Sequence, residues 1–312
     1  MLSLSSMLHL ITFALNSNEC IIMVSIILPT YNRASLVMES IDSVLQQTYP
    51  DFELIIIDDG SDDETEEIVC RIKDARIRYY KMPHSGHTGR LKNYAIKQSK
   101  GDYIAFIDSD DLWKKNKLEK QVHLLMDNDS IGFSITDVTT FKEDKILIEH
   151  SYKTQGQIQC INIFDWLKNN RFLVYNPTLI IRKKCFEKTG LFDEEMLSGD
   201  YHFNMRLAYF FDAGILYDTL VLRRAHDSNM SELFPLENYE EYINTFEYLY
   251  HNKMIERKYL FNAKANAYFK IGRIYKERED ARKARKYYLM SLKYGLFNLK
   301  NYVQIINAMR KL

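Results

Sequence analysis

Hydrophobic positions in the first third of the chain alternate between short uninterrupted runs and segments with helical spacing. Runs rich in β-branched and aromatic residues predict buried strands at 24–29, 52–57, 77–80 and 103–107. The segments between them predict helices at 35–47, 64–73 and 91–98. Strands and helices that alternate in units of about 25 to 30 residues predict βαβ crossovers, and therefore an α/β domain with a mostly parallel sheet.

The pattern after about residue 130 is mixed. A helix is expected at 161–169, and further strands are expected at 131–138, 178–181 and 215–222. From about Pro235 onward the chain is helical and rich in tyrosine. These patterns divide the chain into an N-terminal extension at 1–22, a main domain at 23–231 and a helical C-terminal region at 232–312.

The helical C-terminal region has small and aromatic residues spaced as in one tetratricopeptide-type helix pair. These residues are Ala267, Gly272, Tyr275, Ala281, Ala284, Tyr287 and Leu292. A single such unit has no neighbouring repeat to bury its faces, so we expect it to pack on the main domain. An ordinary helical hairpin is the alternative.

The N-terminal extension at 1–22 is fairly apolar, but polar residues interrupt it throughout. It has neither a basic leading segment nor an uninterrupted apolar run of about 20 residues, so it predicts no cleaved signal and no membrane span. We therefore expect a cytoplasmic protein, either free or peripheral on the inner face of the membrane.

Composition and cysteine spacing narrow the function classes. Lys and Arg total 42, as do Asp and Glu, so the formal net charge is zero and a nucleic-acid partner is not expected. Four widely spaced cysteines form no CxxC or His-Cys metal pattern, which is typical of a reducing compartment.

Polar clusters follow three of the predicted strands, at 30–33, 58–61 and 108–111. In open α/β sheets ligands bind at the carboxyl ends of the strands. Three strand ends that carry reactive groups therefore predict a binding site at this edge.

The last of these clusters places three carboxylates, Asp108, Asp110 and Asp111, directly after a buried strand. Like charges this close resist joint ionisation, and a bound cation relieves the repulsion. Hard oxygen ligands suit Mg²⁺ or Mn²⁺, and a phosphate-bearing substrate commonly completes the shell of such an ion. The alternative is that Asp110 or Asp111 caps the lysine-rich helix that follows.

Asp59 ends the second strand just before Gly60, where its carboxylate could accept a hydrogen bond from an imide N–H such as N3 of uracil. A calcium loop is excluded because this segment lacks the Asp-x-Asp-x-Asp-Gly spacing. A phosphatase of the haloacid-dehalogenase type is disfavoured, since that class places its Asp-x-Asp after the first strand.

Three segments taken in order, VSIILPTYNR at 24–33, IIIDDGSDD at 55–63 and GDYIAFIDSDD at 101–111, resemble the family 2 glycosyltransferases. The resemblance runs to about residue 231. It implies an inverting enzyme of the GT-A fold, a Rossmann-like, mostly parallel sheet flanked by helices, here with a C-terminal α-helical extension. It also implies that 23–111 form the nucleotide-binding half and 112–231 the acceptor half.

The resemblance assigns roles by position. Asp59 would bind the uracil imide, Asp108 the ribose or diphosphate, and Asp110 the metal, with His226 closing over the diphosphate and metal. Arg90 and Lys92 are alternative nucleotide contacts, because Lys92 stands where the family usually has arginine. The nucleotide pocket would be lined by Thr30, Tyr31 and Arg33.

The catalytic base implied by the resemblance is Asp200. The family usually has an acidic pair here, but this chain has Gly199 before Asp200. Asp200 could instead cap the helix that follows it. One general base is sufficient for inversion.

Together these features predict a metal-dependent inverting glycosyltransferase that uses Mn²⁺ or Mg²⁺. It would move a sugar from a nucleotide-sugar donor, in particular a UDP-sugar, to a hydroxyl of a glycan or lipid-linked glycan in polysaccharide biosynthesis. The alternative is a non-catalytic protein that binds a nucleotide sugar or serves as a scaffold.

Overall fold

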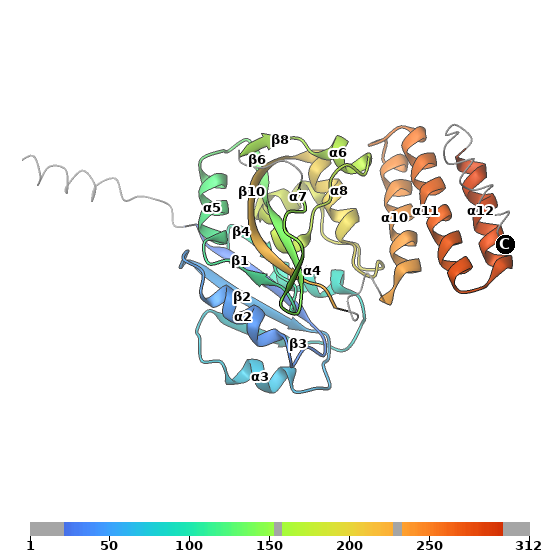
Figure 1. The fold of residues 1–312 in the computed structure, drawn as a ribbon. Helices are drawn as coiled ribbons and strands as arrows, with labels where there is room; N and C mark the ends of the chain where they lie inside the picture. The colour runs from blue at the N-terminus through green and yellow to red at the C-terminus, as the bar shows by residue number, and fades with distance from the viewer. Residues whose placement is uncertain (1–21, 153–157, 227–232, 296–312) are drawn as a thin grey trace, which may run out of the picture.

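A ten-stranded sheet forms the centre of the protein in the computed structural model, which describes residues 22–152, 158–226 and 233–295 (Figure 1). Its strand order is β3-β2-β1-β4-β9-β6-β10-β5, with β7 paired to β6 and β8 paired to β10. Only β9 and β5 run against the other six strands of this path, which confirms the mostly parallel sheet. The strands are β1 (Val24–Thr30), β2 (Phe52–Asp58), β3 (Ile77–Lys81), β4 (Tyr103–Phe106), β5 (Leu112–Trp113), β6 (Ile131–Lys142), β7 (Lys145–Ile148), β8 (Gln159–Ile161), β9 (Ile180–Arg182) and β10 (Asp212–Arg224).

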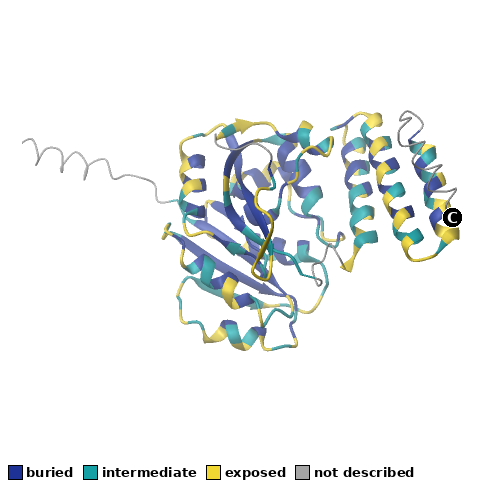
Figure 2. Cartoon of the chain, viewed as in Figure 1, coloured by how far each residue is buried: buried dark blue, intermediate teal, exposed yellow. Residues whose placement is uncertain are grey.

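The sheet is covered on both faces, because alternate residues of a strand point to opposite sides. In β1, Ile26 and Leu28 pack into one core while Ile27 packs into the other. All seven residues of β1 and all seven of β2 are buried, as expected for parallel strands between two layers of helices (Figure 2).

The helices divide between these two cores. The first core packs against α2 (Val37–Leu45), α3 (Thr65–Arg71) and α5 (Lys117–Met126). The second packs against α4 (Thr88–Gln98), α6 (Phe164–Lys168), α7 (Phe186–Thr189), α8 (Asp200–Phe210), α10 (Pro235–His251) and α11 (Arg257–Glu277). The remaining helix is α12 (Ala281–Tyr294), and two 3₁₀ turns lie at Asn176–Thr178 and Lys183–Cys185.

The C-terminal helices stand side by side next to α8, with α12 farthest from the sheet (Figure 1). Phe246 and Leu249 of α10, and Leu260 and Ala263 of α11, belong to the same core as the sheet and α8. Gly272 of α11 lies against the ring of Tyr288 in α12, where an added Cβ would meet the ring at 2.7 Å. The helical region therefore packs on the main domain through α10 and α11.

The acceptor half differs most from the expected elements. Residues 159–161 form strand β8 on the edge of β10, not the start of a helix, and α6 begins only at Phe164. Asn162 explains this boundary, because its amide donates to the Ala208 carbonyl (3.0 Å) and its side-chain oxygen accepts from the Phe164 N–H (3.0 Å).

Within the residues that the structure describes, no helix has both the length and the hydrophobicity needed to cross a bilayer. The N-terminal extension at 1–22 lies outside the described residues except for Ile22, as does the end of the C-terminal region beyond Gly295.

Candidate active site

The three polar strand ends lie side by side at one edge of the sheet. Strand β1 is between β2 and β4 and runs parallel to both, with Thr30 opposite Asp58 and Ile27 opposite Phe106. Because parallel strands end at the same edge, the loops after β1, β2 and β4 meet there, as expected from the sequence.

The loops after β1 and β2 are linked through Asn32. Its backbone N–H donates to Ser61 Oγ (2.9 Å), and its side-chain oxygen accepts from the Asp62 N–H (3.0 Å). Asn32 has a left-handed φ of 49°, which turns the chain back toward the site. The Thr30 hydroxyl is buried here and has no hydrogen-bond partner within the described residues. An unpaired buried hydroxyl at a strand end fits a ligand-binding edge.

Asp59 is buried, and protein donors surround its carboxylate. Oδ1 accepts from the backbone N–H and the hydroxyl of Ser85 (both 2.9 Å), and Oδ2 accepts from the Gly86 N–H (2.8 Å). Nδ1 of His84 lies 2.9 Å from Oδ2, and the His84 ring stacks on Tyr31 with centroids 4.2 Å apart. A carboxylate has about four lone-pair positions. A further donor at Asp59 must therefore replace one of these contacts, and the half-exposed His84 side chain is the most accessible.

The acidic loop after β4 concentrates negative charge. Burial, with the neighbouring carboxylates of Asp110 and Asp200, raises the pKa of Asp108 to about 7, and Lys92 opposes this shift. Burial also raises the pKa of Asp111 well above its ordinary value. Asp111 Oδ1 accepts the backbone N–H of Arg224 (2.9 Å), so this carboxylate joins the acidic loop to the end of β10.

Asp110 of the acidic loop and His226, which follows β10, face each other beside this contact. His226 Nε2 lies 2.9 Å from Asp110 Oδ2, and Arg33 Nε lies 3.7 Å from the same oxygen. Asp110 and His226 are therefore in direct contact, and residues 227–231 of the same motif lie outside the described part. Across 22–152, 158–226 and 233–295, no group of three or more His, Cys, Asp or Glu side chains could hold a metal ion.

The capping alternative for Asp110 and Asp111 is wrong. Strand β5 follows the acidic loop and pairs with β10, Trp113 opposite Val221, so α5 begins only at Lys117 with Asn116 at its N-cap.

Lys92 connects the two halves of the site. Its side chain is only 2% exposed, and its ammonium lies 2.5 Å from Asp200 Oδ1 and 5.2 Å from the centre of the Phe192 ring. Asp200 is the first residue of α8, and its carboxylate pairs with Lys92, while Gly199 occupies the N-cap position. The two alternative basic residues have different partners: Lys92 pairs with Asp200, whereas Arg90 contacts Glu195 (3.2 Å) and the Glu194 carbonyl (3.1 Å).

The loop before Asp200 is held by a residue that the sequence analysis missed. Glu241 of α10 accepts the backbone N–H groups of Ser198 (2.9 Å) and Gly199 (3.4 Å). Glu241 follows Gly199 by 42 residues in a helix with no motif of its own, so no spacing pointed to it. His84 was missed for a similar reason, because its contacts depend on how the loop after β3 folds.

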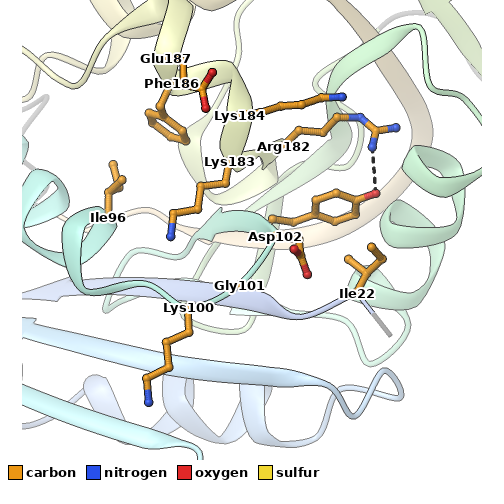
Figure 3. Close-up of a pocket in the computed structure, with 11 residues that line it drawn as sticks. Ile22, Ile96, Lys100, Gly101, Asp102, Arg182, Lys183, Lys184, Phe186 and Glu187 are labelled. Atoms are coloured by element: carbon orange, nitrogen blue, oxygen red, sulfur yellow. Dashed lines mark hydrogen bonds between the residues drawn. The ribbon is translucent and has the colours of Figure 1, made fainter. Parts of the chain in front are cut away.

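A hollow of about 750 Å³ lies elsewhere, at the opposite ends of the strands (Figure 3). It is lined by residues that include Lys100, Asp102, Arg182 and Lys183, where β4 begins and β9 ends. It contains none of the strand-end carboxylates discussed above and is separate from the acidic loop.

Comparison with known proteins adds three findings. Residues 25–190 match the model of Glycosyl transferase family 2. An uncharacterized glycosyltransferase of Rickettsia typhi is 33% identical over 227 residues, 70% of this chain and 69% of that protein. The UDP-Glc:alpha-D-GlcNAc-diphosphoundecaprenol beta-1,3-glucosyltransferase WfgD of Escherichia coli is 42% identical over 106 residues, 34% of this chain and 42% of WfgD.

Among solved structures, S. aureus TarS 1-349 in complex with UDP-GlcNAc has a similar fold, with a TM-score of 0.64. The match covers 93% of this chain and 92% of the TarS chain at 19% sequence identity. This likeness concerns the fold, and it includes the helices beyond the sheet.

Proposed function

We propose that this chain, which belongs to glycosyltransferase family 2 and is a transferase with the GT-A fold, transfers a sugar from a UDP-sugar donor to a hydroxyl of a glycan or lipid-linked glycan. The observation that carries the proposal is the Lys92–Asp200 pair. It brings a carboxylate of the acceptor half beside the acidic loop of the nucleotide half. Family membership favours this transferase over the non-catalytic binding protein.

The donor would bind across the ends of β1, β2 and β4. Tyr31 is 40% exposed and offers an aromatic face for a base, and the buried Thr30 hydroxyl lacks a partner within the described residues. Asp59 would accept the uracil imide N–H once His84 has moved away. Lys92 and Asp108 lie farther along the same edge, where they would meet the ribose and diphosphate.

The acidic loop is suited to a divalent cation. Burial first, and then the neighbouring carboxylates, raise the pKa values of Asp108 and Asp111, and a bound cation would favour the ionised form of both groups. Asp110 Oδ2 and His226 Nε2 are 2.9 Å apart, so an oxygen donor and a nitrogen donor lie together and would hold the ion. Two protein ligands leave room for diphosphate oxygens. When bound, the ion would neutralise charge on the departing diphosphate.

The mixed oxygen and nitrogen donor set favours Mn²⁺ over Mg²⁺, since Mg²⁺ binds mainly to oxygen.

Asp200 would act as the general base. Lys92 holds its Oδ1, and within the described residues no hydrogen bond uses its Oδ2, which could therefore accept the proton of the acceptor hydroxyl. The acceptor oxygen would form a bond to the anomeric carbon as the bond from that carbon to the diphosphate oxygen breaks. The proton would pass to Asp200, and UDP would leave. General bases of this kind contribute about 10²–10⁴-fold to the rate.

The acceptor class is suggested by the relatives and by charge. The name of WfgD includes a diphosphoundecaprenol-linked sugar, which is a lipid-linked glycan. Residues 257–312 contain 15 Lys and Arg against 3 Asp and Glu, so their net charge is +12 while residues 1–256 carry −12. Basic residues are exposed along the outer side of α12 at Arg282, Arg285, Lys286 and Lys293.

We therefore extend the proposal to a peripheral association of this basic face with an anionic bilayer. Sedimentation with phosphatidylglycerol vesicles tests it, with phosphatidylcholine vesicles as the control. Replacing Arg282, Lys286 and Lys293 by Glu should abolish co-sedimentation, and undiminished binding would refute this role for α12.

The transfer reaction is tested by screening UDP-glucose and UDP-N-acetylglucosamine for Mn²⁺-dependent stabilisation against heat and for release of UDP. Asp200→Asn should keep the Mn²⁺-dependent binding of UDP and lose about 10²–10⁴-fold in UDP release. If Asp200→Asn releases UDP at the unaltered rate, Asp200 is not the base.

A further inference from the structure

The loop before the proposed base turns its backbone N–H groups toward the C-terminal helical region. Residues 197–199 lead directly into α8, and the first N–H groups of a helix have no partner within the helix. Glu241 of α10 supplies acceptors to this loop, at 2.9 Å from the Ser198 N–H and 3.4 Å from the Gly199 N–H. A carboxylate at the start of a helix is also favoured by the helix dipole.

An acidic residue at position 199 would be strained in this conformation. Gly199 has a left-handed φ of 70°, and an added Cβ would lie 3.2 Å from the Asp193 carbonyl oxygen. In place of the family's usual acidic pair, this chain has Gly199 and Asp200. The Glu241 carboxylate of α10 accepts the backbone N–H of Gly199.

The other side of the loop is held by α4. The Thr88 N–H donates to the Leu197 carbonyl (3.1 Å), and His87 Nδ1 lies 3.0 Å from the Met196 carbonyl. Lys92, also on α4, pairs with the Asp200 carboxylate. The start of α4 and Lys92 therefore hold the 197–199 loop and Asp200 on the side of the nucleotide half. Glu241 holds the same loop on the side of the helical region.

The Glu241 carboxylate lies at this place at an electrostatic cost. Burial raises the pKa of its carboxyl, the loop N–H groups lower it, and the nearby charge of Asp200 raises it again. Two carboxylates close together in a partly buried place are unfavourable unless each has its own partners. Here Asp200 has Lys92 and Glu241 has the loop amides.

We propose that Glu241 is a positioning residue for catalysis, holding the 197–199 loop so that Asp200 meets the acceptor hydroxyl. The role of Asp200 rests on the proposed function. The helical region, on this view, completes the active site rather than being attached to it.

The test compares Glu241→Ala and Glu241→Gln with Glu240→Ala, an exposed neighbour on the same helix. Hydrogen–deuterium exchange of the peptide covering 195–201 reports on the loop amides without requiring activity. UDP release from the donor that the unaltered chain accepts, UDP-glucose or UDP-N-acetylglucosamine with Mn²⁺, reports on catalysis.

Glu241→Ala should speed exchange at Ser198 and Gly199 and lower kcat for UDP release by about 10–100-fold, because small displacements of a catalytic group have effects of this size. The KM for the donor should change little. Glu241→Gln keeps an acceptor oxygen and should restore part of kcat, and Glu240→Ala should behave as the unaltered chain.

Unchanged exchange in Glu241→Ala would overturn the loop contact. Two results would overturn the positioning role. One is faster exchange with an unchanged kcat, and the other is an equal fall in kcat/KM in both Glu241 variants that comes from a higher KM. If the unaltered chain releases UDP from neither donor, the donor assignment of the proposed function fails, and the exchange result alone decides whether Glu241 holds the loop.

Discussion

His202 makes the docking of α8 against α10 sensitive to pH. Its ring is buried with the edge toward Tyr248, centroids 4.6 Å apart, and neither ring nitrogen has a hydrogen-bond partner within the described residues. Burial, with a smaller effect from the nearby Arg206, lowers the pKa of His202 from 6.5 to about 4. The imidazole is therefore neutral in the folded protein at any pH above about 4.

The sign of the effect follows from proton linkage. The unfolded chain binds a proton near pH 6.5 and the folded chain only near pH 4, so stability is lost as the pH falls through this window. The full shift of about 2.5 units corresponds to about 3.4 kcal/mol, reached only below about pH 4. At about pH 5 the expected loss is about 2 kcal/mol, a factor of about 30 in the folded-to-unfolded ratio.

The assay is urea unfolding at about pH 7.5 and about pH 5, comparing the unaltered chain with His202→Leu. Leucine fills the same buried space without titrating, so the drop in unfolding free energy between the two pH values should be smaller in His202→Leu by about 2 kcal/mol. His251→Leu, at an exposed position of α10, is the control and should retain the larger drop. An identical pH dependence in His202→Leu and the unaltered chain would show that His202 does not cause this loss of stability.

Three further predictions concern the site. Asp110→Ala, or chelation of Mn²⁺ by EDTA, should remove the metal-dependent stabilisation by UDP in a thermal-shift assay. The melting temperature of the ligand-free protein should stay nearly unchanged. Persistence of the stabilisation in Asp110→Ala would contradict the metal assignment. Lys92→Met should lower kcat for UDP release by at least about 10²-fold, because it leaves the carboxylates of Asp108 and Asp200 without their shared cation. Its circular-dichroism spectrum should remain that of a folded protein. A near-normal kcat would show that Lys92 is not required. His84→Ala should tighten UDP binding several-fold in calorimetry, because it removes the ring that occupies Asp59 and Tyr31 in the ligand-free state, and weaker binding would show instead that His84 contacts the base.

The nucleotide half was predictable because its signals are local. Strands β1, β2 and β4 are buried and mostly apolar, and a polar cluster follows each of them immediately in sequence, as with Asp58 and Asp59 at the end of β2. Strand pairing then brings these ends together without further information, since β1 lies between β2 and β4. The convergence of Thr30, Asp59 and Asp108 on one edge required only that the sheet be parallel.

The acceptor half was less predictable because its contacts are not local. Strand β8 is three residues long and largely exposed, and it forms by pairing with the edge of β10. The helix that Asp110 and Asp111 were considered to cap begins later, at Lys117, because β5 first pairs with β10. Glu241 reaches Gly199 through the packing of α10 on α8, which no motif in either segment encodes.

The shared core of the sheet and the C-terminal helices has a consequence for how the protein unfolds. Since Phe246, Leu249 and Leu260 pack with the residues of α8 and the sheet, loss of either part exposes the apolar surface of the other. The catalytic part and α10–α11 should therefore melt in one cooperative transition, with only α12, which has its own small core around Tyr288, able to fray separately. A truncation after residue 231 would thus yield an insoluble or unfolded chain rather than a minimal enzyme, and the shortest stable form should extend through α11.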